Sequence, residues 1–284
     1  MTIEKPASIE SCAEGLEFER PGPIRRALRA AIGNPVANYF PAAVQRLFLK
    51  IMRSELAAAN WTDPGGWRSM VISYQGWPRR LADKLLVVLG TMPTALRNRR
   101  KLAARILAHL IDASDREPVE VLCLGAGPGH IITDALRQAR RRARATLVDL
   151  SSDAHDYGRA LAAESGTADR VRFIHGDVRD VAGMLDRPPD IVKMLGICEY
   201  LSDEHLTDIA RCMADAMPRG ASIVFNSLSE AHGTERFFRR VFGLHMVHRS
   251  PGHLQELMSA AGFSDFTSIA EPLGVYHVIV GRKA

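Results

Sequence analysis

The sequence predicts an α/β fold: a seven-stranded, mostly parallel, doubly wound sheet that ends in an antiparallel hairpin and follows an N-terminal helical cap. Three observations predict it. A short apolar run, Val119–Leu124, breaks into the alternating glycines of Gly125–Gly129. Strand-like and helical patterns then alternate, which is typical of a parallel sheet with helices on both faces. The two last strand-like runs are joined only by residues 271–274, a link too short for a parallel crossover.

The first hundred residues show amphipathic helical segments near 23–32, 42–58 and 81–89. We expect a helical cap over residues 1–106 and the α/β domain over 107–284. Three tryptophans and a tyrosine gather in the cap, and they suit a lid over a ligand, the core of the cap or a contact between two copies. These residues are Trp61, Trp67, Tyr74 and Trp77.

The elements of the α/β domain follow from apolar runs and capping residues. Helices are expected from near His130, from Ser202, whose hydroxyl suits an N-cap, and from Ser250 to Gly262. Strands are expected at 119–124, 145–148, 171–175, 190–197, 222–225, 263–270 and 275–281.

Composition excludes several classes of protein. A chain of 284 residues with 46% apolar residues can bury a full core. Its apolar runs are far shorter than the roughly 20 residues of a membrane helix, and no signal-peptide core is recognised, so we expect a cytoplasmic protein without a membrane partner. The four cysteines form no C-x-x-C pair, which favours reduced thiols without a zinc site.

The glycine turn predicts a nucleotide-like ligand, because glycine leaves the backbone open to close approach. A dinucleotide fingerprint is the first rival interpretation, but the third glycine, Gly129, comes one place early. Asp149 follows the second strand, where its carboxylate suits both ribose hydroxyls of an adenosine. That feature alone does not separate a nicotinamide cofactor from S-adenosylmethionine.

Four landmarks together resemble the class I S-adenosylmethionine-dependent methyltransferases, over roughly residue 107 to the C-terminus. They are the turn Gly125–Gly129, Asp149, the loop Gly176-Asp177-Val178 and the segment Leu195–Leu201. The resemblance implies S-adenosylmethionine as cofactor, with the turn beside its methionine part, Asp149 at the ribose and Leu195-Gly196 near the sulfonium. The implied cofactor-binding residues are Gly125, Ala126, Gly127, Pro128, Gly129, Asp149, Leu150, Asp177, Val178, Leu195 and Gly196.

The methyl acceptor is expected just past strands four and five, because ligands of open α/β sheets bind at the carboxyl ends of strands. The candidate catalytic residues are Glu199, Tyr200 and His245, and the candidate substrate-binding residues are Tyr74, Trp77, Asn226 and His232. A helical insertion between Asn226 and Ser250 is expected to face the cap and help enclose a small acceptor. His245 and His248 are spaced as a metal pair on a helix, but no nearby carboxylate completes a site, so no metal is predicted.

The predicted activity is methyl transfer to N, O or S of a small molecule, and the sequence is compatible with a homodimer. An RNA methyltransferase is the first rival function, supported only by the arginine clusters 97–101 and 137–144. A solvated helix face explains these clusters more simply, although Arg99 or Arg100 could instead contact the cofactor carboxylate. The sequence is also compatible with transfer of an aminopropyl or aminobutyrate group, with a non-catalytic subunit and with nicotinamide binding.

Overall fold

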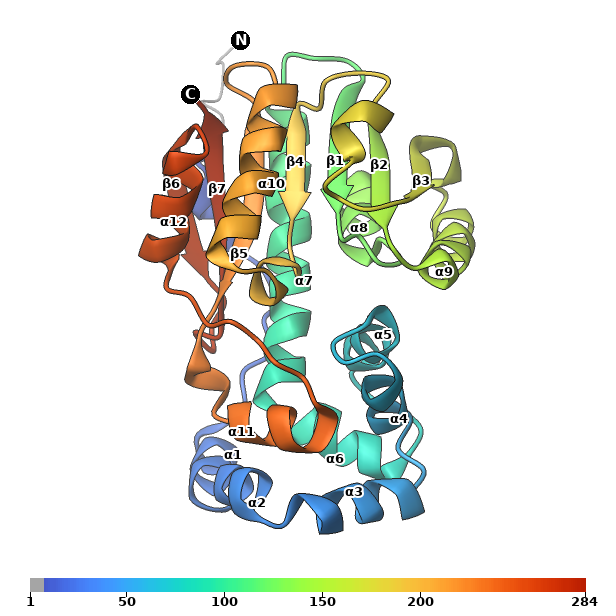
Figure 1. Ribbon diagram of the computed structural model, residues 1–284, viewed down its shortest axis with the longest axis vertical. Helices are drawn as coiled ribbons and strands as arrows, with labels where there is room; N and C mark the ends of the chain where they lie inside the picture. The colour runs from blue at the N-terminus through green and yellow to red at the C-terminus, as the bar shows by residue number, and fades with distance from the viewer. Residues whose placement is uncertain (1–7) are drawn as a thin grey trace.

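The computed structural model describes residues 8–284 and shows a seven-stranded sheet in the order β3-β2-β1-β4-β5-β7-β6 (Figure 1). β7 pairs antiparallel with both β5 and β6, while the pairs among the first five strands are parallel. The predicted fold class is therefore confirmed. The strands are β1 Val119–Leu124, β2 Ala143–Asp149, β3 Val171–His175, β4 Ile191–Met194, β5 Ser222–Leu228, β6 Phe263–Ala270 and β7 Tyr276–Lys283.

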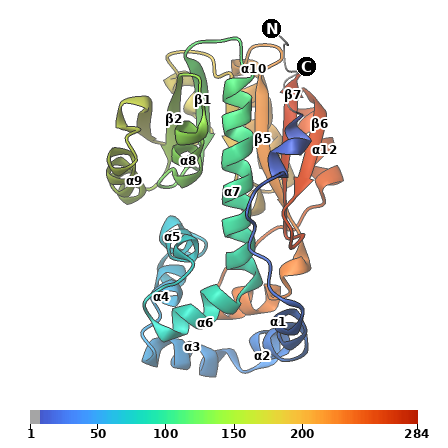
Figure 2. The same ribbon diagram turned by 180° about the vertical axis from the view of Figure 1, so that it is seen from behind.

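Helices cover both faces of the sheet. α7 (Thr91–Asp112) and α8 (His130–Gln138) lie on one face, and α10 (Asp203–Ala216) and α12 (Pro251–Ala260) lie on the other (Figures 1 and 2). Successive side chains of a strand point to opposite faces. Val121 of β1 accordingly joins the core under α7 and α8, whereas its neighbour Leu122 joins the core under α10 and α12. α9 (Ser152–Glu164) packs against α8 and β3.

α7 connects the cap to the sheet. Its 22 residues correspond to about 33 Å of helix, and it runs from the cap along the length of the sheet (Figure 2). The predicted boundary after residue 106 falls inside this helix. The short helix η1 (Ile9–Ala13) also packs on α7 and β6, with Cys12 in the core beneath them. This early segment therefore contributes to the α/β core.

The cap is helical, as predicted, and consists of short helices. The segment 42–58 is two helices because Arg53 takes a positive φ and Ser54 starts a new helix as its N-cap. The buried Asp83 accepts hydrogen bonds from the Ser54 hydroxyl and from two backbone amides of the new helix. The elements are α1 Pro23–Leu28, η2 Arg29–Gly33, α2 Asn34–Tyr39, α3 Ala42–Ile51, α4 Glu55–Thr62, α5 Trp67–Gln75 and α6 Leu81–Leu89.

The insertion between β5 and α12 packs on the cap, as expected. It contains α11 (Glu235–Phe237) and the π-helical turn η7 (Phe238–Phe242). Asn38 of α2 donates to the Gly233 carbonyl and accepts from the Phe237 amide. Trp61 of α4 donates its indole N–H to the carbonyl of Val241. These hydrogen bonds join segments that are far apart in the chain.

All four cysteines are free thiols. Among the helices that residues 8–284 form, none has both the length and the apolar character needed to cross a bilayer.

Candidate functional site

The site begins at the glycine turn between β1 and α8. Gly125 and Gly129 have φ values of +55° and +85°, a left-handed conformation that other residues rarely adopt. A Cβ added at Gly125 would collide with the side chain of Ile197, and one at Gly129 with that of Leu147. Both glycines are therefore required by the backbone conformation and by close packing on these side chains at the carboxyl end of β1.

Asp149 at the end of β2 is held against this turn. Its Oδ2 accepts from the Gly127 amide at 2.7 Å, and its Oδ1 accepts from the Ser151 amide at 2.9 Å. A carboxylate has about four lone-pair positions. Two therefore remain for a ligand, such as the two hydroxyls of a ribose.

A cavity of about 460 Å³ extends from the glycine turn to the cap. It lies at the carboxyl ends of the parallel strands, where β4 points toward the cap in Figure 1. Every residue predicted to contact the cofactor lines it except Asp177. Tyr74, Glu199 and Tyr200 line it as well. The residues of its apolar wall come from the cap, α7, the insertion and β7, and include Leu56, Met92, Leu96, Phe238, Phe242, Leu244, Met246 and Tyr276.

Helix α5 of the cap lies over the glycine turn through an aromatic cluster. Trp67 packs on Tyr157 of α9 with ring centroids 5.4 Å apart, and Tyr74 packs on His130 of α8 at 5.4 Å. His130 and Tyr157 complete the cluster at 5.8 Å. Arg68 also pairs with Asp153 of α9 at 2.7 Å. Of the roles expected for the tryptophans, this arrangement supports a lid for Trp67.

The aromatic cluster makes stability depend on pH. Burial, with Arg100 nearby, lowers the pKa of His130 to about 4 from 6.5. The unfolded chain therefore binds more protons than the folded chain between pH 6.5 and 4, and the free energy of unfolding falls as the pH decreases, by up to about 1.4 kcal/mol per unit from this residue. Urea denaturation at pH 7 and pH 5 should show that the free energy of unfolding falls less between the two pH values in His130→Gln than in the wild type. An equal loss in both proteins contradicts the assignment.

The cavity wall next to the glycine turn contains a buried charge pair. Arg99 of α7 lies 3.4 Å from the Glu199 carboxylate and 3.3 Å from the Asn226 Oδ1, with its guanidinium over the ring of Tyr276. The same Asn226 oxygen accepts from the Gly196 amide at 2.8 Å. Arg99 and Asn226 therefore fix the loop after β4, and with it the carboxylate that faces the cavity.

The prediction of a solvated arginine face is wrong for two members of the first cluster. Arg97 and Arg99 are buried, and Arg97 pairs with Glu19 at 2.6 Å. Arg97 thus pairs with a partly exposed carboxylate and Arg99 with the buried carboxylate of Glu199. Arg100 is only partly buried, and it pairs with Asp134 at 2.7 Å.

Lys193 is a cavity residue that sequence reasoning missed. It lies in β4 opposite Cys123 of β1, is 4% exposed and lines the cavity. Burial lowers the pKa of its ammonium group. The signal that could have found it is a single lysine inside an otherwise apolar strand, since such a residue needs a polar surrounding to be stable there.

Several predicted contacts lie elsewhere. Asp177 is held by an ion pair with Arg179, and the hydrogen bonds from Arg179 lower its pKa to about 2. Trp77 is 67% exposed and lies against Lys84 rather than the cavity. Asn226 is fully buried behind the cavity wall, where it supports Gly196. None of the three is among the lining residues.

The histidines predicted after β5 also lie outside the cavity lining. His245 is exposed on the insertion. His232 is fully buried, hydrogen-bonded through Nδ1 to Thr234, and burial and the nearby His248 lower its pKa to about 4. The expectation that no carboxylate lies near these histidines is wrong, because Glu235 lies 3.5 Å from His248.

Comparisons with known proteins identify the family. Residues 80–283 match the model of the family described as "Putative methyltransferase". The chain belongs to this methyltransferase family. The class I fold and S-adenosylmethionine as cofactor, both expected from the sequence, are thereby confirmed. The magnesium protoporphyrin IX methyltransferase (ChlM) of Synechocystis PCC 6803, solved with bound SAH, matches with a TM-score of 0.58 and 12% identity, over 86% of this chain and 99% of that one.

Two curated relatives differ in acceptor. Phenazine O-methyltransferase PhzM of Lysobacter antibioticus is 30% identical over 168 residues, which cover 56% of this methyltransferase and 47% of the relative. The tRNA 5-carboxymethoxyuridine methyltransferase of Escherichia coli K12 is 31% identical over 99 residues, 35% of each chain. The chain thus spans less than half the length of the curated relatives it matches. Membership of the family leaves the acceptor open.

Proposed function

We propose that this methyltransferase transfers the methyl group of S-adenosylmethionine to a nucleophilic atom of a small, largely apolar molecule, with an aromatic hydroxyl as the favoured acceptor. The observation that supports this most is the cavity that joins the glycine turn to an apolar wall formed by the cap and the insertion. The relation to a phenazine O-methyltransferase supports an oxygen acceptor. A cytoplasmic location, supported by the four free thiols, is part of the proposal.

The residues present fit the cofactor. The glycine turn lines the cavity, and Asp149 beside it has lone pairs free for the two hydroxyls of a ribose. Gly125–Gly129 would hold its methionine part, Asp149 its ribose and Val178 its adenine. When bound, the cofactor supplies an electrophilic methyl carbon on a sulfonium.

The remaining residues of the cavity would position the acceptor. Glu199 and Tyr200 face the cavity beside Gly196, where they can accept or donate hydrogen bonds to an acceptor hydroxyl. Phe238 and Phe242 provide an apolar surface for a ring. Orientation alone contributes up to about 7–11 kcal/mol to such a displacement. Trp67 on α5 excludes water from the mouth of the cavity.

RNA is less well supported as the acceptor. Arg97 and Arg99 are buried and cannot reach phosphates. The second cluster, residues 137–144, lies around the amino end of β2, roughly 20 Å from the carboxyl end at Asp149. An RNA chain bound to that cluster would not place a base in the cavity at the other end of the sheet.

The proposal is tested by mass spectrometry of reactions with S-adenosylmethionine and a panel of aromatic hydroxy compounds, with tRNA in parallel. We expect S-adenosylhomocysteine and a methylated aromatic product, and no methylated tRNA. Methylation of tRNA alone contradicts the proposal. Methylthioadenosine as the by-product would indicate aminobutyrate transfer, and no turnover of any acceptor would favour a non-catalytic subunit.

The cap offers a surface for a homodimer, which we include in the proposal. Large apolar side chains at helical spacing are exposed on α1, η2 and α2, namely Ile24, Leu28, Ile32 and Val36, and exposed apolar patches often mark interfaces. We expect light scattering to give twice the chain mass for the wild type and one chain mass for Leu28→Lys. A monomeric wild type at its highest attainable concentration contradicts this.

A further inference from the structure

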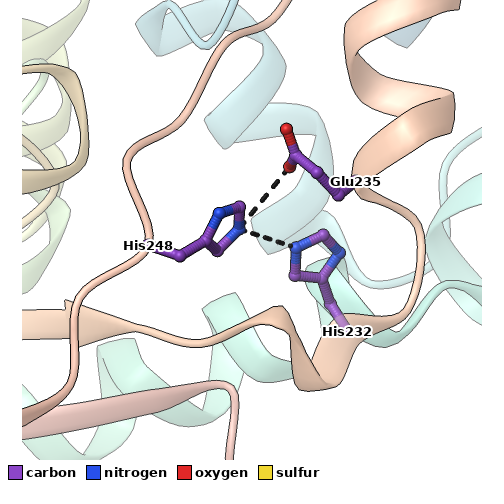
Figure 3. A group of neighbouring side chains, drawn as sticks. All are labelled: His232, Glu235 and His248. Atoms are coloured by element: carbon purple, nitrogen blue, oxygen red, sulfur yellow. Dashed lines mark hydrogen bonds and ion pairs between the residues drawn. The ribbon is translucent and has the colours of Figure 1, made fainter.

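A cluster of two histidines and a glutamate lies outside the cavity lining, within the insertion between β5 and α12 (Figure 3). His232 comes from the turn η6 (Glu230–His232), Glu235 from the start of α11 and His248 from the loop before α12. The Nε2 atoms of the histidines are 3.3 Å apart, and the Glu235 Oε2 lies 3.5 Å from the His248 Nε2. One ligand atom from each residue lies within 4.8 Å of the others.

We propose that His232, Glu235 and His248 bind a Zn²⁺ ion. Zinc binds histidine nitrogen and carboxylate oxygen at about 2.0–2.1 Å in tetrahedral geometry, so two of its ligands lie roughly 3.3–3.4 Å apart. Both short separations in the cluster are close to that spacing. Two neutral imidazoles and one carboxylate leave the fourth position to water.

The surroundings orient each ligand. Thr234 Oγ1 lies 3.1 Å from the His232 Nδ1, so it can accept that N–H and leave Nε2 free for the metal, as outer partners of metal-binding histidines do. The Thr234 amide also lies near Nδ1, and it stabilises the other tautomer when the metal is absent. Arg239 donates to the Glu235 Oε1.

The other oxygen of Glu235 is the second observation that points to an ion. This Oε2 is buried and accepts no hydrogen bond from the described residues. A buried carboxylate oxygen without a donor is costly. A cation between it and the two imidazoles would satisfy it.

The ion would join the first part of the insertion to its last part, which is held on the loop after β4. The Val247 amide, next to His248, donates to the Glu199 carbonyl at 2.8 Å. The Arg249 guanidinium donates to the carbonyls of Cys198 and Leu201, both at 2.6 Å. Glu235 lies at the other end of the insertion, just before Phe238 and Phe242 of the cavity wall. The site is separate from the proposed methyl transfer and does not depend on it.

The test is a titration of the chelator-stripped full chain with zinc chloride against a competing chromogenic chelator. We expect one equivalent of Zn²⁺ per chain and a higher melting temperature in its presence. Glu235→Gln and His248→Gln should each weaken binding by about tenfold or more, because even outer partners of a metal site contribute 10–100-fold. His245→Gln, at an exposed histidine of the same insertion, should bind like the wild type.

Two outcomes overturn the proposal. One is the lack of saturable binding at one equivalent in the wild type. The other is unchanged affinity in Glu235→Gln and His248→Gln, which would place any bound zinc elsewhere. Far-ultraviolet circular dichroism of the two variants, together with their binding of S-adenosylhomocysteine, separates loss of the metal site from loss of the fold. If His248→Gln does not fold, the isosteric variant Glu235→Gln alone decides the test.

Discussion

Asp149→Ala is expected to weaken S-adenosylhomocysteine binding by about 100-fold or more. The carboxylate has lone pairs free for two ribose hydroxyls, and hydrogen bonds to a charged group contribute about 1.5–3 kcal/mol each, where 1.4 kcal/mol is tenfold in affinity. The variant also loses the contacts that hold Asp149 to the Gly127 and Ser151 amides. Isothermal titration calorimetry of the wild type and the variant measures the difference.

Asp149→Asn and Asp156→Asn serve as controls for this prediction. Asp149→Asn keeps one acceptor oxygen, so its affinity for S-adenosylhomocysteine should lie between those of the wild type and the alanine variant. Asp156 is an exposed acid on neighbouring α9, and its replacement should leave affinity unchanged. Equal affinity in the wild type and Asp149→Ala would show that the ribose is held elsewhere.

Arg99→Met is expected to lower the free energy of unfolding by about 3–5 kcal/mol. The substitution leaves the buried Glu199 carboxylate without its cation, and breaking a buried pair by removing one partner typically costs that much. Methionine preserves most of the packing volume against Tyr276. Urea denaturation at pH 7 gives the change directly.

The double variant Arg99→Met/Glu199→Gln separates stability from function. It removes the uncompensated charge and should recover most of the lost stability. If Glu199 contacts the acceptor as proposed, methyl transfer should stay low in this variant despite the recovered stability. A single Arg99→Met variant as stable as the wild type contradicts the role of the pair.

The sheet was predictable because its signals are local. Alternating apolar runs mark the strands, and the short link between β6 and β7, residues 271–275, forces an antiparallel pair. The cap was less predictable. The break at Arg53 depends on Asp83, which caps α4 from 28 residues away in the sequence, and α5 was not predicted as a helix.

The cofactor side of the cavity could be predicted because the carboxyl ends of neighbouring parallel strands meet at one edge of a sheet. The buried charge pair could not be predicted, since Arg99 reaches Glu199 from a helix 100 residues away. The pair His245 and His248 shows a second limit of prediction from the sequence, the dependence on local secondary structure. A spacing of three places two side chains on one face only in a helix. Residues 244–248 form no helix, and His248 meets His232 and Glu235 while His245 is exposed.

The central claim is that one cavity holds the cofactor against the glycine turn and the acceptor against the apolar wall. A crystal structure of the full chain grown with S-adenosylhomocysteine tests it most directly. We expect its ribose within hydrogen-bonding distance of Asp149, its methionine part along Gly125–Gly129 beneath Trp67, and its sulfur facing Glu199 and Tyr200. Density for the compound that does not touch Asp149 or the glycine turn would contradict the account.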